Sequence, residues 1–118
     1  MNEDLKTPYE LFGIECGKGW KSLYQPILDR IEEINRETES NIVPTQIKEK
    51  FGRLVFYLNE ENDELSKMIK NVFEKSSHIC ENCGKPTETI DDGGWLYTLC
   101  KDCYDGYKRR TQELMNKG

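Results

Sequence analysis

The sequence predicts an α+β fold in which a helix–hairpin–helix body precedes a C-terminal module organised by four cysteines. Three observations lead to this prediction. Two segments carry apolar residues at the three- and four-residue spacing of one helix face. Between these segments lie two runs rich in branched and aromatic residues, joined by a turn that contains glycine. Two Cys-x2-Cys pairs follow, and their separation is typical of a site for a single metal ion.

The body is predicted to span residues 1–77 and to begin with two helices. A short helix is expected at 8–12, because the letters TPYE at its start combine a capping threonine, a proline suited to the first turn and a glutamate. The glycine-rich segment GIECGKG that follows is interpreted as a loop. A longer helix is expected at 23–38, where apolar residues recur along one face.

A hairpin and a further helix complete the predicted body. The hairpin is placed at 45–58, with its turn at the glycine of the sequence KEKFGR. One face of this hairpin is expected to pack on the long helix, because its side chains alternate between two sides. The last helix is placed at 63–77, with Asp63 as its expected cap.

The pairs Cys80-x2-Cys83 and Cys100-x2-Cys103 define a predicted module at residues 78–118. Two residues between cysteines allow a tight turn to direct both sulfur atoms at one ion, and sixteen residues separate the pairs. We therefore expect one Zn²⁺ ion with four thiolate ligands. Four thiolates leave no open coordination position, so the ion is expected to be structural.

Around these cysteines the sequence resembles a treble-clef zinc finger, with a knuckle, a predicted hairpin and two ligands at the start of a helix. Rubredoxin-type iron is a rival, although Tyr104 stands where a second glycine knuckle would need glycine. A thioredoxin-like redox pair is a weaker alternative. His78 is interpreted as an exposed residue, and a role as a supporting group or alternative ligand stays open.

A second candidate site lies at the hairpin turn, where three cations stand close to aromatic residues. Such a group could hold a phosphate or a nucleotide, with an aromatic ring stacked on the base. The alternative is a solvated hairpin whose charges protect its edge. The two tryptophans could stack on a ligand or lie in the core. The candidate ligand-binding residues are Lys48, Lys50, Phe51, Arg53, Tyr57, Trp20 and Trp95.

Two further groups suggest other functions. Lys108, Arg109 and Arg110 form a basic cluster in the last predicted helix and could contact nucleic acid, although cations near a helix C-terminus also suit the helix dipole. Cys16 could be a nucleophile, but no histidine is close to it in the sequence. The main function is therefore expected to be non-catalytic.

Composition limits the classes of protein to which the chain can belong. The 118 residues carry a formal net charge of −5, whereas non-specific nucleic-acid binding usually needs a basic surplus. The acidic start MNEDLKTPYE does not resemble a signal peptide, and no apolar run has the length of a membrane span. We therefore expect a cytoplasmic protein, in which five cysteines indicate metal or free thiols rather than disulfides.

Three motifs give the chain a resemblance to a group of small uncharacterised phage and prophage proteins. They are a Gly-x-Gly-Trp at 17–20, a Lys-Glu-Lys-Phe-Gly at 48–52 and the cysteine unit at 80–103. In many of these proteins the central motif continues Leu-Arg-Phe-Tyr, whereas this chain has Val55 in place of the arginine. The resemblance implies a phage-type accessory protein in a bacterial host and supplies no known activity.

These observations lead to three functional hypotheses. The first is a zinc-stabilised protein that binds a host protein or a nucleotide-like signal, as an antagonist of host defence would do. The second is a nucleic-acid-binding regulator that acts through the late basic cluster. The third is an enzyme that uses Cys16. The oligomeric state stays open in all three.

Overall fold

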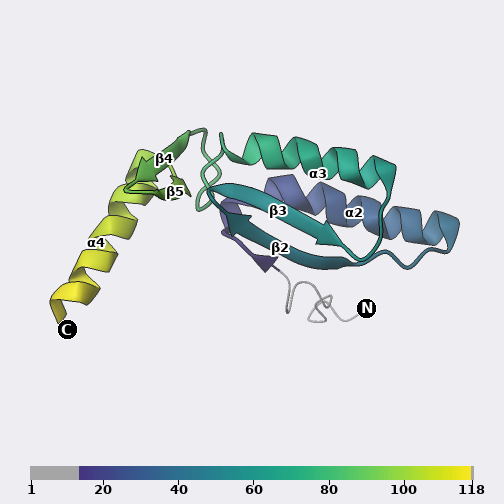
Figure 1. Cartoon of the computed structure of the whole chain (residues 1–118), viewed down its shortest axis with the longest axis horizontal. Coiled ribbons are helices and arrows are strands. Elements are labelled where there is room, and N and C mark those ends of the chain that lie inside the picture. Colours follow the sequence, from purple (N-terminus) through teal and green to yellow (C-terminus); the bar gives the residue numbers. More distant parts are fainter. Residues whose placement is uncertain (1–13, 118) are drawn as a thin grey trace.

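The computed structural model describes residues 14–117 (Figure 1), so the predicted helix at 8–12 lies outside the described residues. In chain order the elements are β1 (Ile14–Glu15), the 3-10 helix η1 (Lys18–Trp20), α2 (Lys21–Thr38), β2 (Pro44–Lys50), β3 (Arg53–Leu58), α3 (Asp63–Ser76), β4 (Thr89–Asp92), β5 (Trp95–Thr98) and α4 (Lys101–Lys117). None of the helices in this described range is both long enough and apolar enough to cross a membrane.

The fold is α+β, but the predicted helix–hairpin–helix architecture with a treble-clef-like module is wrong. The described chain has three α-helices and two small sheets. In the first sheet, β1 pairs in parallel with β2, and β2 pairs antiparallel with β3. β1 belongs to the segment interpreted as a loop, and its two residues are too few to show the alternation of a strand. The division into 1–77 and 78–118 stays a prediction.

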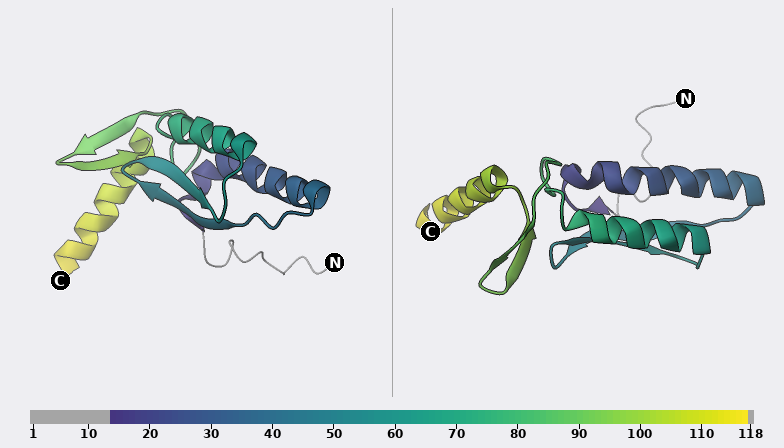
Figure 2. Two further views of the ribbon diagram at one scale, coloured as in Figure 1. Left: turned by 45° about the vertical axis from the view of Figure 1, so that its right-hand side comes forward. Right: turned by 90° about the horizontal axis from the view of Figure 1, so that it is seen from above.

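The core lies between the three-stranded sheet and two helices. Figures 1 and 2 show α2 and α3 side by side on the same face of this sheet. Strands β2 and β3 place Ile47 opposite Phe56, and both side chains are buried. The core residues come from η1, α2, the segment before β2, the sheet and α3: Trp20, Leu23, Tyr24, Ile27, Leu28, Ile31, Ile34, Ile42, Ile47, Leu54, Phe56, Leu65 and Val72.

The start of α3 differs from the sequence-based expectation. Asn62, rather than Asp63, is the capping residue, and its side-chain oxygen accepts a hydrogen bond from the backbone N–H of Leu65 at 3.0 Å. Asp63 instead lies in the first turn, where a carboxylate suits the positive end of the helix dipole. Both residue types are good caps, so sequence preference alone does not distinguish them.

Close backbone contacts join the body to the first cysteine pair. The N–H of Gly19 donates to the carbonyl of Glu81 at 2.7 Å, and Nε1 of Trp20 donates to the carbonyl of Ile79 at 2.7 Å. A Cβ atom on Gly19 would lie only 2.3 Å from the carbonyl oxygen of Cys80. The glycine therefore permits an approach between two segments that any side chain would prevent.

A second contact joins the turn between β2 and β3 to the smaller sheet. The hydroxyl of Thr98 on β5 donates to the carbonyl of Gly52, and it lies 2.8 Å from the hydroxyl of Thr89 on β4. Thr98 is fully buried. The Gly-x-Gly-Trp, the Lys-Glu-Lys-Phe-Gly and the cysteine unit thus meet at one junction. Beyond this junction, α4 extends away from the body (Figures 1 and 2).

We predict that Gly19→Ala destabilises the protein by about 2 kcal/mol or more, because overpacking against rigid backbone is costly. The added Cβ would lie 2.3 Å from the carbonyl oxygen of Cys80 and 2.6 Å from that of Glu81. Urea denaturation of both proteins measures the difference in unfolding free energy.

Gly106→Ala is the matched control, since its Cβ would meet only Nη1 of Arg110, at 3.7 Å. Alanine is favoured over glycine in a helix by about 1 kcal/mol, so this variant should be as stable as the parent or more so. Equal stability of Gly19→Ala and Gly106→Ala would contradict the proposed close approach.

Candidate functional site

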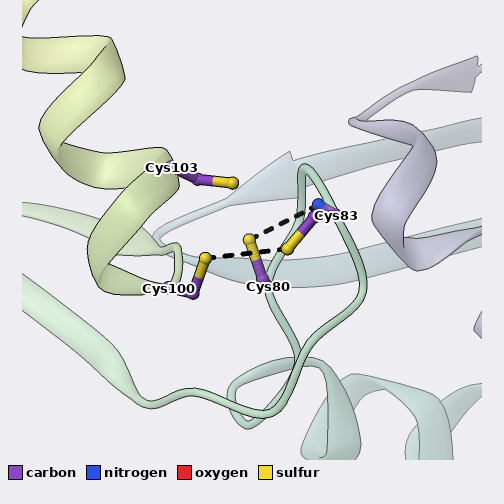
Figure 3. A group of neighbouring side chains, drawn as sticks. All are labelled: Cys80, Cys83, Cys100 and Cys103. Atoms are coloured by element: carbon purple, nitrogen blue, oxygen red, sulfur yellow. Dashed lines mark hydrogen bonds between the residues drawn. The ribbon is translucent and has the colours of Figure 1, made fainter.

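The four cysteines of the two pairs form a group that could hold a metal ion (Figure 3). Their sulfur atoms all lie within 4.8 Å of one another, and those of Cys83 and Cys100 are 3.6 Å apart. In a tetrahedral site with zinc–sulfur bonds of about 2.3 Å, neighbouring sulfurs are about 3.8 Å apart. The arrangement therefore fits one four-coordinate ion.

Local backbone structure brings the sulfur atoms together. In the first pair, the N–H of Gly84 donates to the carbonyl of Cys80 at 2.9 Å, and Gly84 has a φ of +83°. The N–H of Cys80 in turn donates to the carbonyl of Lys85 at 2.7 Å. In the second pair, Cys100 immediately precedes α4 and Cys103 lies in its first turn. A tight turn and a helix start thus face each other across the site.

Hydrogen bonds to sulfur prepare part of the group for ionisation. Burial alone raises the pKa of the Cys80 thiol, but backbone N–H groups of Cys100, Cys83 and Asn82 outweigh burial and lower it to about 6. The Asn82 side chain donates to Sγ of Cys103 at 3.2 Å and lowers the pKa of that thiol, yet the neighbouring thiols and burial raise it to about 12. Because adjacent thiolates repel, all four would ionise together only around a cation.

Two residues considered for chemistry lie outside this group. Burial, and then the carboxylates of Glu81 and Glu49, raise the pKa of the Cys16 thiol to about 12. Very little thiolate exists at neutral pH with such a pKa, so Cys16 is poorly suited to act as a nucleophile. His78 is exposed, and its Nδ1 lies 2.8 Å from a carboxylate oxygen of Glu88.

A cavity of about 720 Å³ adjoins the cysteine group, within the usual size range of ligand sites. We call it the junction cavity, because it lies where the three sequence motifs meet. Its walls come from segments that are far apart in the sequence. They consist of Gly17, Glu49, Phe51, Glu81, Asn82, Gly94, Trp95, Leu96, Tyr97, Leu99, Cys103, Tyr107 and Arg110.

Aromatic rings dominate this cavity. Phe51 is 69% exposed and Trp95 is 73% exposed, although both are large apolar side chains. The rings of Tyr97 and Tyr107 contact each other with centroids 5.3 Å apart. Large exposed aromatic residues that gather at a cavity are typical of a surface that contacts a ligand or partner.

Two carboxylates are held in place beside these rings. Glu49 accepts a hydrogen bond from the N–H of Gly52 at 2.8 Å, and Glu81 accepts one from the N–H of Gly17 at 2.9 Å. Burial raises the pKa of Glu81, and the nearby carboxylate of Glu49 adds to this effect. Arg110 is the cation among the lining residues. The cavity wall therefore carries more negative than positive groups.

The tertiary structure separates the predicted ligand-binding residues. Phe51 and Trp95 both line the junction cavity, and both are exposed enough to contact a ligand there. Trp20 is fully buried and lies in the core, where no ligand could stack on its ring. Lys48 and Lys50 are absent from the cavity wall.

The remaining two predicted residues lie along β3. The guanidinium carbon of Arg53 is 4.9 Å from the ring centroid of Phe73, so this cation stacks on a side chain of α3. Tyr57 lines a separate groove between β3 and α3. The turn therefore does not gather its three cations into the junction cavity.

The late basic cluster is also divided. Nζ of Lys108 forms an ion pair with Asp92 at 3.0 Å. The hydrogen bond from the Tyr104 hydroxyl, and then the contact with Lys108, keep the pKa of the Asp92 carboxyl below its usual value. Arg110 lines the junction cavity, whereas Lys108 and Arg109 line a different hollow on α4. That hollow also carries two carboxylates, those of Asp102 and Asp105, which would oppose the approach of a phosphate backbone.

Among the charged and aromatic residues of the cavity wall, sequence reasoning missed four: Glu49, Glu81, Tyr97 and Tyr107. Glu49 lies between Lys48 and Lys50, and of these three residues only the two cations are ligand-binding candidates from the sequence. In sequence, Tyr97 and Tyr107 look like ordinary core residues of a strand and a helix. For Glu81 a signal was available, because it lies inside the first cysteine pair. Any segment that packs against the first cysteine pair must therefore come close to Glu81.

No protein-family model, curated protein or solved structure matches the chain.

We predict that Cys83→Ser abolishes metal binding, whereas Cys16→Ser retains it. Cys83 is exposed, so the loss of its sulfur removes little packing, while the metal group loses a ligand. Elemental analysis of the purified proteins should give one ion per chain for Cys16→Ser. The unfolding free energy of Cys83→Ser should fall by several kcal/mol, since metal binding contributes on the order of 10 kcal/mol in small sites. Equal metal content in the two variants would contradict the four-cysteine site.

Proposed function

We propose that the chain is a non-catalytic binding protein that is stabilised by one structural Zn²⁺ ion and binds its partner at the junction cavity. One observation carries this proposal: residues from all three sequence motifs meet at a single cavity, directly beside the four cysteines. The metal fixes the cavity walls, and the exposed aromatic residues supply the contact area. The resemblance to small phage proteins supports an accessory role in the cytoplasm of a bacterial host, such as the antagonism of a defence factor.

The donor set supports zinc as the metal. Four thiolates in a tetrahedral arrangement suit zinc or iron, and zinc is the usual ion where two Cys-x2-Cys pairs share one site. A four-thiolate zinc ion has no open position for water or substrate, which argues for a structural role. Rubredoxin-type iron would be recognised at once by its strong visible absorption.

Two features argue against catalysis. The closed coordination disfavours activation of a substrate by the metal. The pKa of Cys16, raised to about 12 by burial and by Glu81 and Glu49, disfavours the thiolate that a nucleophile requires. Binding is therefore the function that these groups support.

A host protein suits the cavity better than a nucleotide-like signal. Trp95 and Phe51 are both more than two-thirds exposed, and exposed aromatic residues are enriched where proteins contact one another. The carboxylates of Glu49 and Glu81 would repel a phosphate group, while Arg110 alone would attract it. Pairing of Lys108 with Asp92 likewise weakens the case for nucleic acid.

The backbone at Phe51 supports a functional role for its ring. Phe51 and Gly52 have φ values of 53° and 78°, which are typical of a two-residue hairpin turn of type I′. Asparagine or glycine easily adopts the left-handed backbone conformation of the first turn position. A bulky aromatic residue in that conformation reduces the folding stability by about 1 kcal/mol or more. A strained and exposed phenylalanine does not improve folding, so its ring is best explained by a contact with a partner.

We predict that Phe51→Asn raises the unfolding free energy of the zinc-loaded protein by roughly 1 kcal/mol while it weakens partner binding. The gain is expected because Asn-Gly is the preferred sequence for this turn. Urea denaturation measures it, and Lys50→Asn provides a neighbouring exposed control that should bring no gain. A less stable Phe51→Asn protein would show that the ring supports the fold instead.

Affinity purification and native mass spectrometry test the proposed function directly. A tagged chain isolated from bacterial cells should carry one zinc ion and a stoichiometric protein partner. Trp95→Ala should lose the partner and keep the zinc, because the exposed ring lies in the cavity wall and is no ligand of the metal. Leu114→Ala is the matched control, since Leu114 is 72% exposed on α4 but does not line the cavity. A partner retained by Trp95→Ala, or a chain without zinc, would refute the proposal.

A further inference from the structure

The junction cavity combines aromatic rings with carboxylates, and both kinds of group attract cations. The faces of aromatic rings carry partial negative charge, which draws ammonium or guanidinium groups to them. Phe51 and Trp95 line this cavity and are each more than two-thirds exposed, and Tyr97 lines it as well. Glu49 and Glu81 add two carboxylates. The wall is thus complementary to a positive group.

Within the described part of the chain, neither carboxylate forms an ion pair with a cation. Among the ion pairs of residues 14–117, none involves Glu49 or Glu81. Both groups lie in the wall of the same cavity. Arg110 lines the same cavity without pairing with either of them, and Lys50 lies 5.8 Å from the Phe51 ring centroid. A cation supplied from outside could therefore interact with both carboxylates at once.

Glycine backbone groups hold both carboxylates in fixed positions. One oxygen of Glu49 accepts from Gly52, and one oxygen of Glu81 accepts from Gly17. Since a carboxylate can accept about four hydrogen bonds, each retains acceptor capacity for a donor within the cavity. A ligand would therefore meet acceptors that need little reorganisation, which favours tight binding.

A guanidinium group fits these features better than an ammonium group does. It is planar, so it can stack on a ring, and its fork of five N–H donors can reach two carboxylates at once. An ammonium group is compact, strongly hydrated and unable to stack. We propose that the junction cavity binds the guanidinium group of an arginine side chain presented by the partner protein. This inference rests on the proposed binding function.

N-acetyl-arginine amide is a suitable probe, because its blocked ends leave the guanidinium as its charged group. NMR spectra of the ¹⁵N-labelled, zinc-loaded full chain contain the indole N–H signals of two tryptophans. Trp95→Phe assigns them. We expect the probe to shift the Trp95 signal in a saturable manner and to leave that of the buried Trp20 unchanged. The lysine analogue should bind more weakly, and the uncharged citrulline analogue should not bind.

Glu49→Gln should weaken binding of the arginine probe by about fivefold or more, since a charge-assisted hydrogen bond is lost. Glutamine keeps an oxygen that can accept from Gly52, so the turn should persist. Glu32→Gln removes an exposed carboxylate of α2 that does not line the cavity, and it should bind the probe normally. The comparison of the arginine and citrulline probes uses the parent chain. It therefore tests whether the guanidinium charge is needed for binding even if Glu49→Gln fails to fold.

Three outcomes would overturn the inference. They are no saturable shift with the arginine probe, equal or tighter binding of the lysine or citrulline analogue, and tighter binding of guanosine monophosphate. The last result would leave the junction cavity as a binding site and would change only the class of its ligand. Loss of partner binding by Trp95→Ala tests the proposed function separately, so the two failures can be distinguished.

Discussion

The approach of the Gly17–Gly19 backbone to the first cysteine pair is the constraint on which the rest of the structure depends. Gly17 and Glu81 are 64 residues apart, yet a Cβ atom on Gly17 would lie 2.4 Å from the Glu81 carbonyl oxygen. Because this contact is made by backbone atoms, it sets the position of the cysteine turn relative to the sheet. The hydrogen bonds of Thr98 to Gly52 and to Glu81 then place the second sheet, and a metal ion shared by the four cysteines would hold the start of α4 against the cysteine turn.

The proposed metal site and the proposed binding surface are neighbours that use different residues. A metal ion held by the four cysteines would join the turn at Cys80 and Cys83 to the start of α4 at Cys100 and Cys103. α4 carries both Tyr107 and Arg110, which are three residues apart on this helix and both line the cavity. The free energy of binding a metal at the four cysteines would therefore preorganise the cavity wall, although none of the four thiolates would leave an open coordination position.

Several features of the junction cavity reduce stability, and they occur together. Phe51 adopts a backbone conformation that suits asparagine or glycine, while Trp95 exposes a large apolar surface. Glu49 and Glu81 place like charges near each other. A sequence optimised only for folding would avoid each of these choices. Their concentration at one place is the main structural support for the proposed binding role of this cavity.

The sequence by itself determined the features that have a local signature. Cysteine spacing predicted the metal group, and apolar periodicity indicated helices at 23–38 and 63–77, where the structure has α2 and α3. The tertiary structure decided the rest. The two-residue strand β1 is too short to produce a pattern, and the cavity unites segments around Gly17, Phe51 and Trp95. Periodicity and spacing report hydrogen bonds and faces within one segment, whereas glycine contacts between distant segments leave no periodic trace.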